Sequence, residues 1–132
     1  MRILLAEDDA NIRSIARTTL EKLGGHEVTT VENGSQAVET TRRERFDLLI
    51  LDGMMPELDG FEACTVIKRE PGLSQDTPVI FMTAKSQTSD IQDGFDRGAI
   101  GYIVKPFDVR TLCEQINQLY LRYRENLARE RT

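Results

Sequence analysis

The sequence has 132 residues, of which 39% are hydrophobic and 30% are charged, and its net charge is −5. These values fit one globular domain with an ordinary apolar core and a solvated surface. The sequence has no run of about 18 apolar residues, so no membrane span is expected. Acids follow Met1 too early for a signal peptide. We therefore expect a cytoplasmic protein. The negative charge disfavours direct contact with nucleic acid.

Short apolar runs alternate with helical patterns along the chain. Continuous apolar runs are typical of strands covered on both faces, whereas a half-polar run favours an edge strand. The expected strands are 3–6, 27–32 (the half-polar run), 48–51, 79–82 and 102–104. The expected helices are 12–23, 34–44, 60–70, 89–97 and a long last helix starting near Asp108. This alternation favours an α/β fold, a parallel sheet with helices on both faces.

Local signals predict how two of the helices begin. Asp9 fits the N-cap of the first helix. Ser89 and Gln92 fit a capping box at the start of the fourth helix, which Gly94 weakens by about 1 kcal/mol relative to alanine. The stripe of the first helix expected to face the sheet consists of Ile12, Ile15, Ala16, Leu20 and Leu23.

Polar residues directly follow four of the predicted strands. They are Glu7, Asp8 and Asp9 after the first strand, Asp52 after the third, Thr83 after the fourth and Lys105 after the fifth. Ligand sites of open α/β sheets lie beyond the carboxyl ends of the strands, so these side chains should converge. Clustered carboxylates repel one another, and a divalent cation removes the repulsion. A small set of oxygen ligands suits Mg²⁺.

Asp52, at the centre of this group, is the natural nucleophile for forming an acyl phosphate. The cation would neutralise charge on a phosphoryl group during in-line transfer. Lys105 and the hydroxyl of Thr83 would each hold a phosphoryl oxygen. These residue types therefore point to phosphoryl chemistry at the carboxyl end of the sheet.

Four segments of the chain together resemble the receiver domain of response regulators in two-component signalling. They are ILLAEDDANIR (3–13), LLILDGMMPELDGFE (48–62), VIFMTA (79–84) and GYIVKPF (101–107). The resemblance covers nearly the whole chain, from Met1 to about Tyr120. It implies a flavodoxin-like (βα)5 doubly wound sheet with strand order 2-1-3-4-5. It also places the receiver domain at residues 1–121.

The resemblance implies a role for each matching acidic residue. Asp52 is expected to be the phosphoacceptor. Mg²⁺ is expected to bind Asp8 directly, Glu7 through water, and Asp52 together with the backbone carbonyl of Met54. A partner histidine kinase or histidine phosphotransfer domain would supply the phosphoryl group. The domain would then be a switch that assists its own phosphorylation and dephosphorylation, and not an enzyme with a separate substrate.

The resemblance also implies how the switch responds. Thr83 would move toward the phosphoryl group, and Tyr102 would turn into the space that this movement opens. The changed face would comprise the fourth helix, the fifth strand and the fifth helix. The Lys105–Pro106 bond is expected to be cis, a conformation essentially confined to X-Pro bonds.

Two other functions compete with the phosphorylation switch. One is a receiver-like binding module that is never phosphorylated, which the intact set of acids, Thr83 and Lys105 argues against. The other is a magnesium-dependent aspartate phosphatase resembling the haloacid dehalogenases. Such enzymes require a second acid two residues after the nucleophile, where this chain has Met54.

Residues 122–132 are expected to prolong the last helix beyond the sheet, as a tail or as the start of a linker. A linker would lead to an output domain or a downstream protein. A phosphorylation-dependent homodimer is a further expectation. The segment GAIGY (98–102) lacks the acids of the charged dimer face found in receivers with winged-helix outputs, which disfavours that particular dimer and leaves another open.

Overall fold

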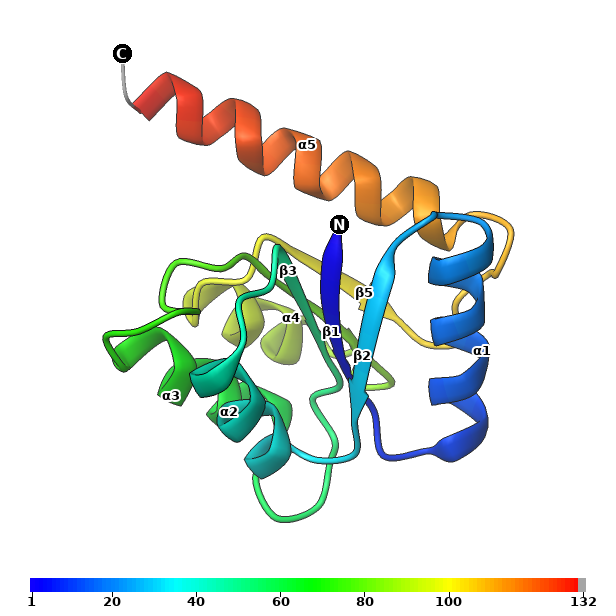
Figure 1. Ribbon diagram of the computed structural model, residues 1–132, viewed down its shortest axis with the longest axis horizontal. Coiled ribbons are helices and arrows are strands. Elements are labelled where there is room, and N and C mark those ends of the chain that lie inside the picture. Colours follow the sequence, from blue (N-terminus) through cyan, green and yellow to red (C-terminus); the bar gives the residue numbers. More distant parts are fainter. Residues whose placement is uncertain (131–132) are drawn as a thin grey trace.

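The computed structural model describes residues 1–130, which alternate strand and helix five times (Figure 1). In chain order the elements are β1 (Arg2–Ala6), α1 (Ala10–Lys22), β2 (Glu27–Val31), α2 (Gly34–Arg43), β3 (Leu48–Leu51), α3 (Gly60–Arg69), β4 (Val79–Thr83), α4 (Thr88–Asp96), β5 (Gly101–Val104) and α5 (Leu112–Glu130). All paired strands are parallel, and their order is β2-β1-β3-β4-β5. The predicted flavodoxin-like α/β fold is confirmed.

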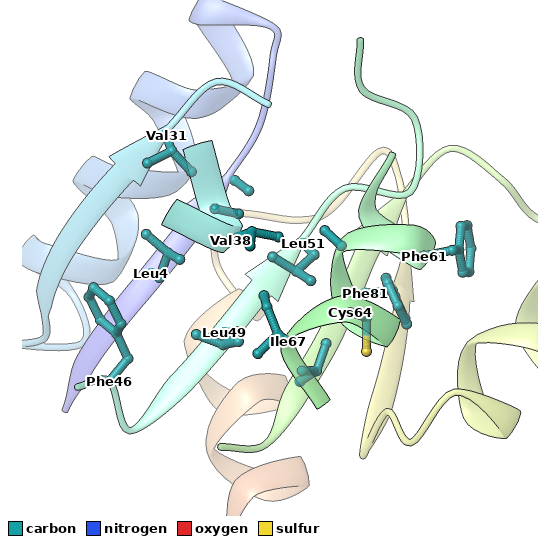
Figure 2. Close-up of a cluster of buried hydrophobic side chains, with 14 residues drawn as sticks. Leu4, Val31, Val38, Phe46, Leu49, Leu51, Phe61, Cys64, Ile67 and Phe81 are labelled. Atoms are coloured by element: carbon teal, nitrogen blue, oxygen red, sulfur yellow. The ribbon is translucent and has the colours of Figure 1, made fainter. Parts of the chain in front are cut away.

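Each face of the sheet carries its own apolar core. Successive residues of a strand point to opposite faces, so Leu4 and Ala6 of β1 join one cluster and Ile3 and Leu5 join the other. Helices α2 and α3 cover the first cluster, shown in Figure 2, and α1 and α5 cover the second. Burial on both faces explains why the inner strands are continuous apolar runs.

The order of the strands opens a crevice at one end of the sheet. The chain passes from β1 outward to β2 and then returns to β3 on the other side of β1. The chain leaves β1 and β3 toward helices on opposite faces of the sheet, and ligands of doubly wound sheets bind at such a point. The two loops start side by side, because Asp52 donates its backbone N–H to the carbonyl of Ala6.

The predicted start of the fourth helix is wrong by a short distance. The N-cap of α4 is Gln87, and the capping box pairs Gln87 with Asp90 in place of Ser89 with Gln92. The backbone N–H of Gln87 donates to the Asp90 carboxylate at 3.2 Å. Gln92 instead donates to Asp96 at 2.8 Å, one turn further along the helix.

Two other expectations about helices need correction. The last helix begins at Leu112, because the carbonyl of Asp108 first accepts the backbone N–H groups of Thr111 and Leu112 in a turn. Ile15 of α1 and Leu23, the C-cap of α1, are 50% and 68% exposed and do not face the core. Within residues 1–130 we find no helix with the length and hydropathy needed to span a bilayer.

Helix α3 starts in direct contact with the strand end that carries Asp52. A Cβ atom at Gly60 would lie 2.1 Å from the carbonyl oxygen of Asp52, whereas a Cβ atom at Gly72 would meet nothing within 4 Å. We predict that Gly60→Ala lowers the free energy of unfolding by about 2 kcal/mol or more, because the backbone must move. The matched change Gly72→Ala should stay within about 0.5 kcal/mol of wild type. Denaturant titration of both variants measures this, and equal stabilities would contradict the close packing.

Candidate functional site

Four strand ends bring polar side chains into the crevice. Glu7 and Asp8 follow β1, Asp52 follows β3, and Lys105 follows β5, while Thr83 is the last residue of β4. Carboxylate oxygens of Glu7, Asp8 and Asp52 all lie within 4.8 Å of one another. Glu7 is 1% exposed and Asp52 is 4% exposed, whereas Asp8 is exposed to solvent. The predicted convergence is confirmed for Glu7, Asp8, Asp52 and Lys105.

The loop after β1 is held at both of its ends. At its start, the backbone N–H of Glu7 donates to the carbonyl of Val31 at 3.0 Å and prolongs the sheet. At its end, the Asp9 carboxylate accepts the backbone N–H groups of Asn11 and Ile12 at 2.9 and 3.0 Å. Asp9 is therefore the N-cap of α1, as predicted, and its carboxylate does not belong to the acidic cluster.

Lys105 joins two of the three carboxylates. Its ammonium donates to Oδ2 of Asp52 at 2.7 Å and to Oε1 of Glu7. Burial opposes the charge of Lys105, but the hydrogen bonds to Asp52 and Glu7 outweigh it and raise the pKa of this lysine. Lys105 thus remains an ammonium at neutral pH. The Lys105–Pro106 peptide bond is cis, as predicted.

Glu7 is a carboxyl group whose protonation is sensitive to pH near neutrality. Burial raises its pKa from 4.5 to about 7, and the charge of Asp52 adds to this effect. The hydrogen bonds from Lys105 and from the backbone N–H of Asp9 act in the opposite direction. The cluster therefore carries more negative charge than the buried surroundings readily accommodate.

Thr83 and Tyr102 lie on neighbouring strands and share Lys85 as a neighbour. The fully buried hydroxyl of Thr83 accepts the backbone N–H of Lys85 at 3.3 Å, and the Tyr102 hydroxyl donates to the Lys85 carbonyl at 2.8 Å. The ring of Tyr102 lies 6.1 Å from that of Phe81. Burial and the charge of Asp90 raise the pKa of Tyr102 to about 12, so its hydroxyl stays a donor.

Some contacts at the site were not anticipated from the sequence. Arg13, on the first turn of α1, donates to the backbone carbonyls of Glu7 and Asp8. The backbone N–H of Met54 donates to Oδ1 of Asp52 at 2.9 Å. Arg13 lies within the segment ILLAEDDANIR, one turn after the N-cap Asp9, so its spacing places it near the loop after β1 but does not indicate which atoms it bonds.

A family model for the response regulator receiver domain matches residues 3–117. The chain belongs to this family. One relative is the "Probable transcriptional regulator ycf27" of Porphyridium aerugineum, 38% identical over 121 residues that cover 92% of this chain and 48% of that protein. The chain thus spans about half the length of the curated relatives it matches.

Solved receiver structures have the same fold. The chemotaxis response regulator CheY4 of Vibrio cholerae superposes with a TM-score of 0.82 at 30% identity, covering 89% of this chain and 97% of CheY4. The receiver domain of the sensor histidine kinase PA1611 of Pseudomonas aeruginosa PAO1 gives 0.80 at 30% identity, covering 90% and 96%. That structure has a magnesium ion coordinated in the active site cleft.

The raised pKa of Glu7 leads to a pH-dependent prediction for this receiver domain. The folded protein favours the protonated form of Glu7. The free energy of unfolding therefore falls as pH rises from 4.5 to about 7, and the loss is complete above pH 7. A pKa shift of this size lowers the free energy of unfolding by about 3 kcal/mol. Without divalent cations, Glu7→Gln should therefore be more stable than wild type above pH 7, and the difference should shrink toward pH 5. Denaturant titrations at pH 5, 6, 7 and 8 with a chelator measure it. A difference that does not vary with pH would contradict the assignment.

Proposed function

We propose that this receiver domain is a phosphorylation-dependent signalling switch and that Asp52 is its phosphoacceptor. The observation that carries this proposal is the geometry of the Asp52 carboxylate. One oxygen accepts the backbone N–H of Met54, and the other accepts the ammonium of Lys105. The carboxylate is therefore held in a single orientation in the crevice, as a nucleophile toward phosphorus must be.

The donor set of the crevice fits Mg²⁺. It consists of hard oxygen atoms, with carboxylates of Glu7, Asp8 and Asp52 inside 4.8 Å. We assign Asp8, Asp52 and the backbone carbonyl of Met54 as direct ligands, with Glu7 acting through water. When bound, the ion would supply positive charge against the carboxylates and against the oxygens of a transferring phosphoryl group.

Asp52, Lys105 and Thr83 have separate roles in the transfer of the phosphoryl group. A phosphohistidine on a histidine kinase or phosphotransfer partner would lose its N–P bond as Asp52 forms an O–P bond. Lys105 would hold one oxygen of the phosphoryl group, and the hydroxyl of Thr83 another. Membership of the receiver family and the oxygen ligands of the crevice support a partner with a phosphohistidine as the source of the phosphoryl group. The domain promotes only its own modification.

The output would follow from the contacts of Thr83 and Tyr102. A phosphoryl group on Asp52 adds charge and strong acceptor oxygens that attract the Thr83 hydroxyl. Movement of Thr83 would break its contact with the backbone of Lys85, whose carbonyl also holds Tyr102. The populations of the α4–β5–α5 face would then shift between two states.

The longer relatives suggest how this switch connects to an output. Helix α5 continues to Glu130, beyond the residues 3–117 matched by the family model. We propose that residues 1–121 form the receiver unit and that 122–132, of which 131–132 lie outside the described residues, begin a connection to an output domain. A phosphorylation-dependent homodimer is compatible with this arrangement, and we propose it as the consequence of the changed face.

The phosphoacceptor role is tested directly by chemical phosphorylation. Wild-type protein incubated with acetyl phosphate and Mg²⁺ should gain the mass of one phosphoryl group, measured by intact mass spectrometry. Asp52→Asn should gain none, because the nucleophilic oxygen is replaced. The matched control Asp59→Asn changes the acidic N-cap of α3 outside the cluster and should be phosphorylated like wild type. Phosphorylation of Asp52→Asn would refute the assignment.

The coupling between the site and the output face has its own test. Beryllium fluoride with Mg²⁺, a phosphoryl mimic, should shift backbone amide resonances throughout 83–106. In Thr83→Ala the shifts beside Asp52 should persist while those near Tyr102 disappear, because the hydroxyl that transmits the change is absent. Shifts confined to the surroundings of Asp52 in the wild type would contradict the coupling.

A further inference from the structure

The three carboxylates of the cluster are not held in the same way. Glu7 accepts from Lys105 and from the backbone N–H of Asp9, and Asp52 accepts from Lys105 and Met54. Within residues 1–130 the carboxylate of Asp8 accepts no hydrogen bond and forms no ion pair, and Asp8 is exposed. Its direction therefore depends on the backbone that carries it.

One side chain holds that backbone on both sides of Asp8. Nη1 of Arg13 donates to the carbonyl oxygen of Glu7 at 2.9 Å and to that of Asp8 at 3.3 Å. The first carbonyl belongs to the peptide plane before Asp8, and the second belongs to the plane after it. Two peptide planes that meet at one Cα define the direction of its Cα–Cβ bond, and so the region that the carboxylate can reach.

Arg13 is itself held in place from a third segment. Its Nη2 forms an ion pair with Glu32 at 3.3 Å, just beyond β2, and its side chain is only 19% exposed. The planar guanidinium can make these bonds together because its donors are arranged in a rigid fork. Arg13 thus links α1, the loop after β1 and the segment after β2, without bonding to any carboxylate of the cluster.

We propose that Arg13 is a positioning residue that orients Asp8 for a divalent cation. This inference depends on the magnesium site of the proposed function. Orientation and charge have opposite effects, which makes the role measurable. A guanidinium that acted only through its charge would repel the cation, so its removal would strengthen binding. A guanidinium that orients the ligand would weaken binding when removed, as loss of outer contacts to metal ligands does.

The test compares Mg²⁺ affinity, measured by calorimetry, in wild type and three variants. Arg13→Gln should bind on the order of tenfold more weakly. Arg13→Lys keeps the positive charge but lacks the planar guanidinium, so its Mg²⁺ affinity should lie between those of Arg13→Gln and wild type. Arg17→Gln, the matched control, removes a guanidinium of α1 that, among the described residues, pairs only with Glu21 on the same helix, so its affinity should stay within about twofold of wild type.

Hydrogen exchange supplies a readout independent of the metal. In magnesium-free protein, the amides of Asp8 and Asp9 should exchange faster in Arg13→Gln than in Arg17→Gln. Affinity in Arg13→Gln equal to or tighter than that of wild type would overturn the role of Arg13. Should that variant fail to fold by circular dichroism, the same criterion applies to Arg13→Lys. A wild type that binds no Mg²⁺ would instead overturn the proposed function.

Discussion

The concentration of negative charge at the carboxyl end of the sheet is the constraint on which the rest of the site depends. Glu7 and Asp52 are almost fully buried, and a buried charge is costly unless it is paired. Lys105 pairs with both, although it lies 98 and 53 residues from them in the chain. The site therefore exists only when β1, β3 and β5 occupy their places in one sheet. Asp8, the exposed third acid, adds charge that Lys105 does not bond. This imbalance is the physical reason that a dication fits the crevice.

The same constraint explains the packing around the crevice. Helix α3 begins where Gly60 contacts the carbonyl of Asp52, so the loop after β3 has no room to move away from the cluster. On the other side, Asp9 starts α1 directly after the acids and keeps the loop after β1 short. The crevice is therefore bounded by close backbone contacts after β1 and β3. Thr83 and Tyr102, on β4 and β5, instead meet at the backbone of Lys85, in the loop before α4. Movement of either side chain would therefore alter contacts with the same backbone segment.

Much of this arrangement could be predicted from the sequence because strands buried on both faces are easy to recognise and their ends are marked by polar residues. Glu7, Asp52 and Lys105 each follow such a strand, and their convergence depends only on the topology of the sheet. Contacts with backbone atoms could not be predicted in this way. Nothing in the residue pattern says that Arg13 donates to carbonyls, because every residue has one. Likewise Ile15 and Leu23 are apolar at helical spacing, but the width of the buried stripe depends on which neighbours α1 packs against. The start of α4 was mistaken since Ser89 is the stronger capping residue by type, whereas Gln87 and Asp90 have the required geometry.

A crystal structure of the protein grown with Mg²⁺ tests the central claim most directly. We expect a hexacoordinate ion about 2.1 Å from one oxygen of Asp8 and one of Asp52, with water completing its shell. Glu7 should lie in hydrogen-bonding range of one of those waters. The claim would be contradicted by a crevice without an ion at saturating Mg²⁺, with Lys105 still bonded to Glu7 and Asp52 and the Asp8 carboxylate turned toward solvent.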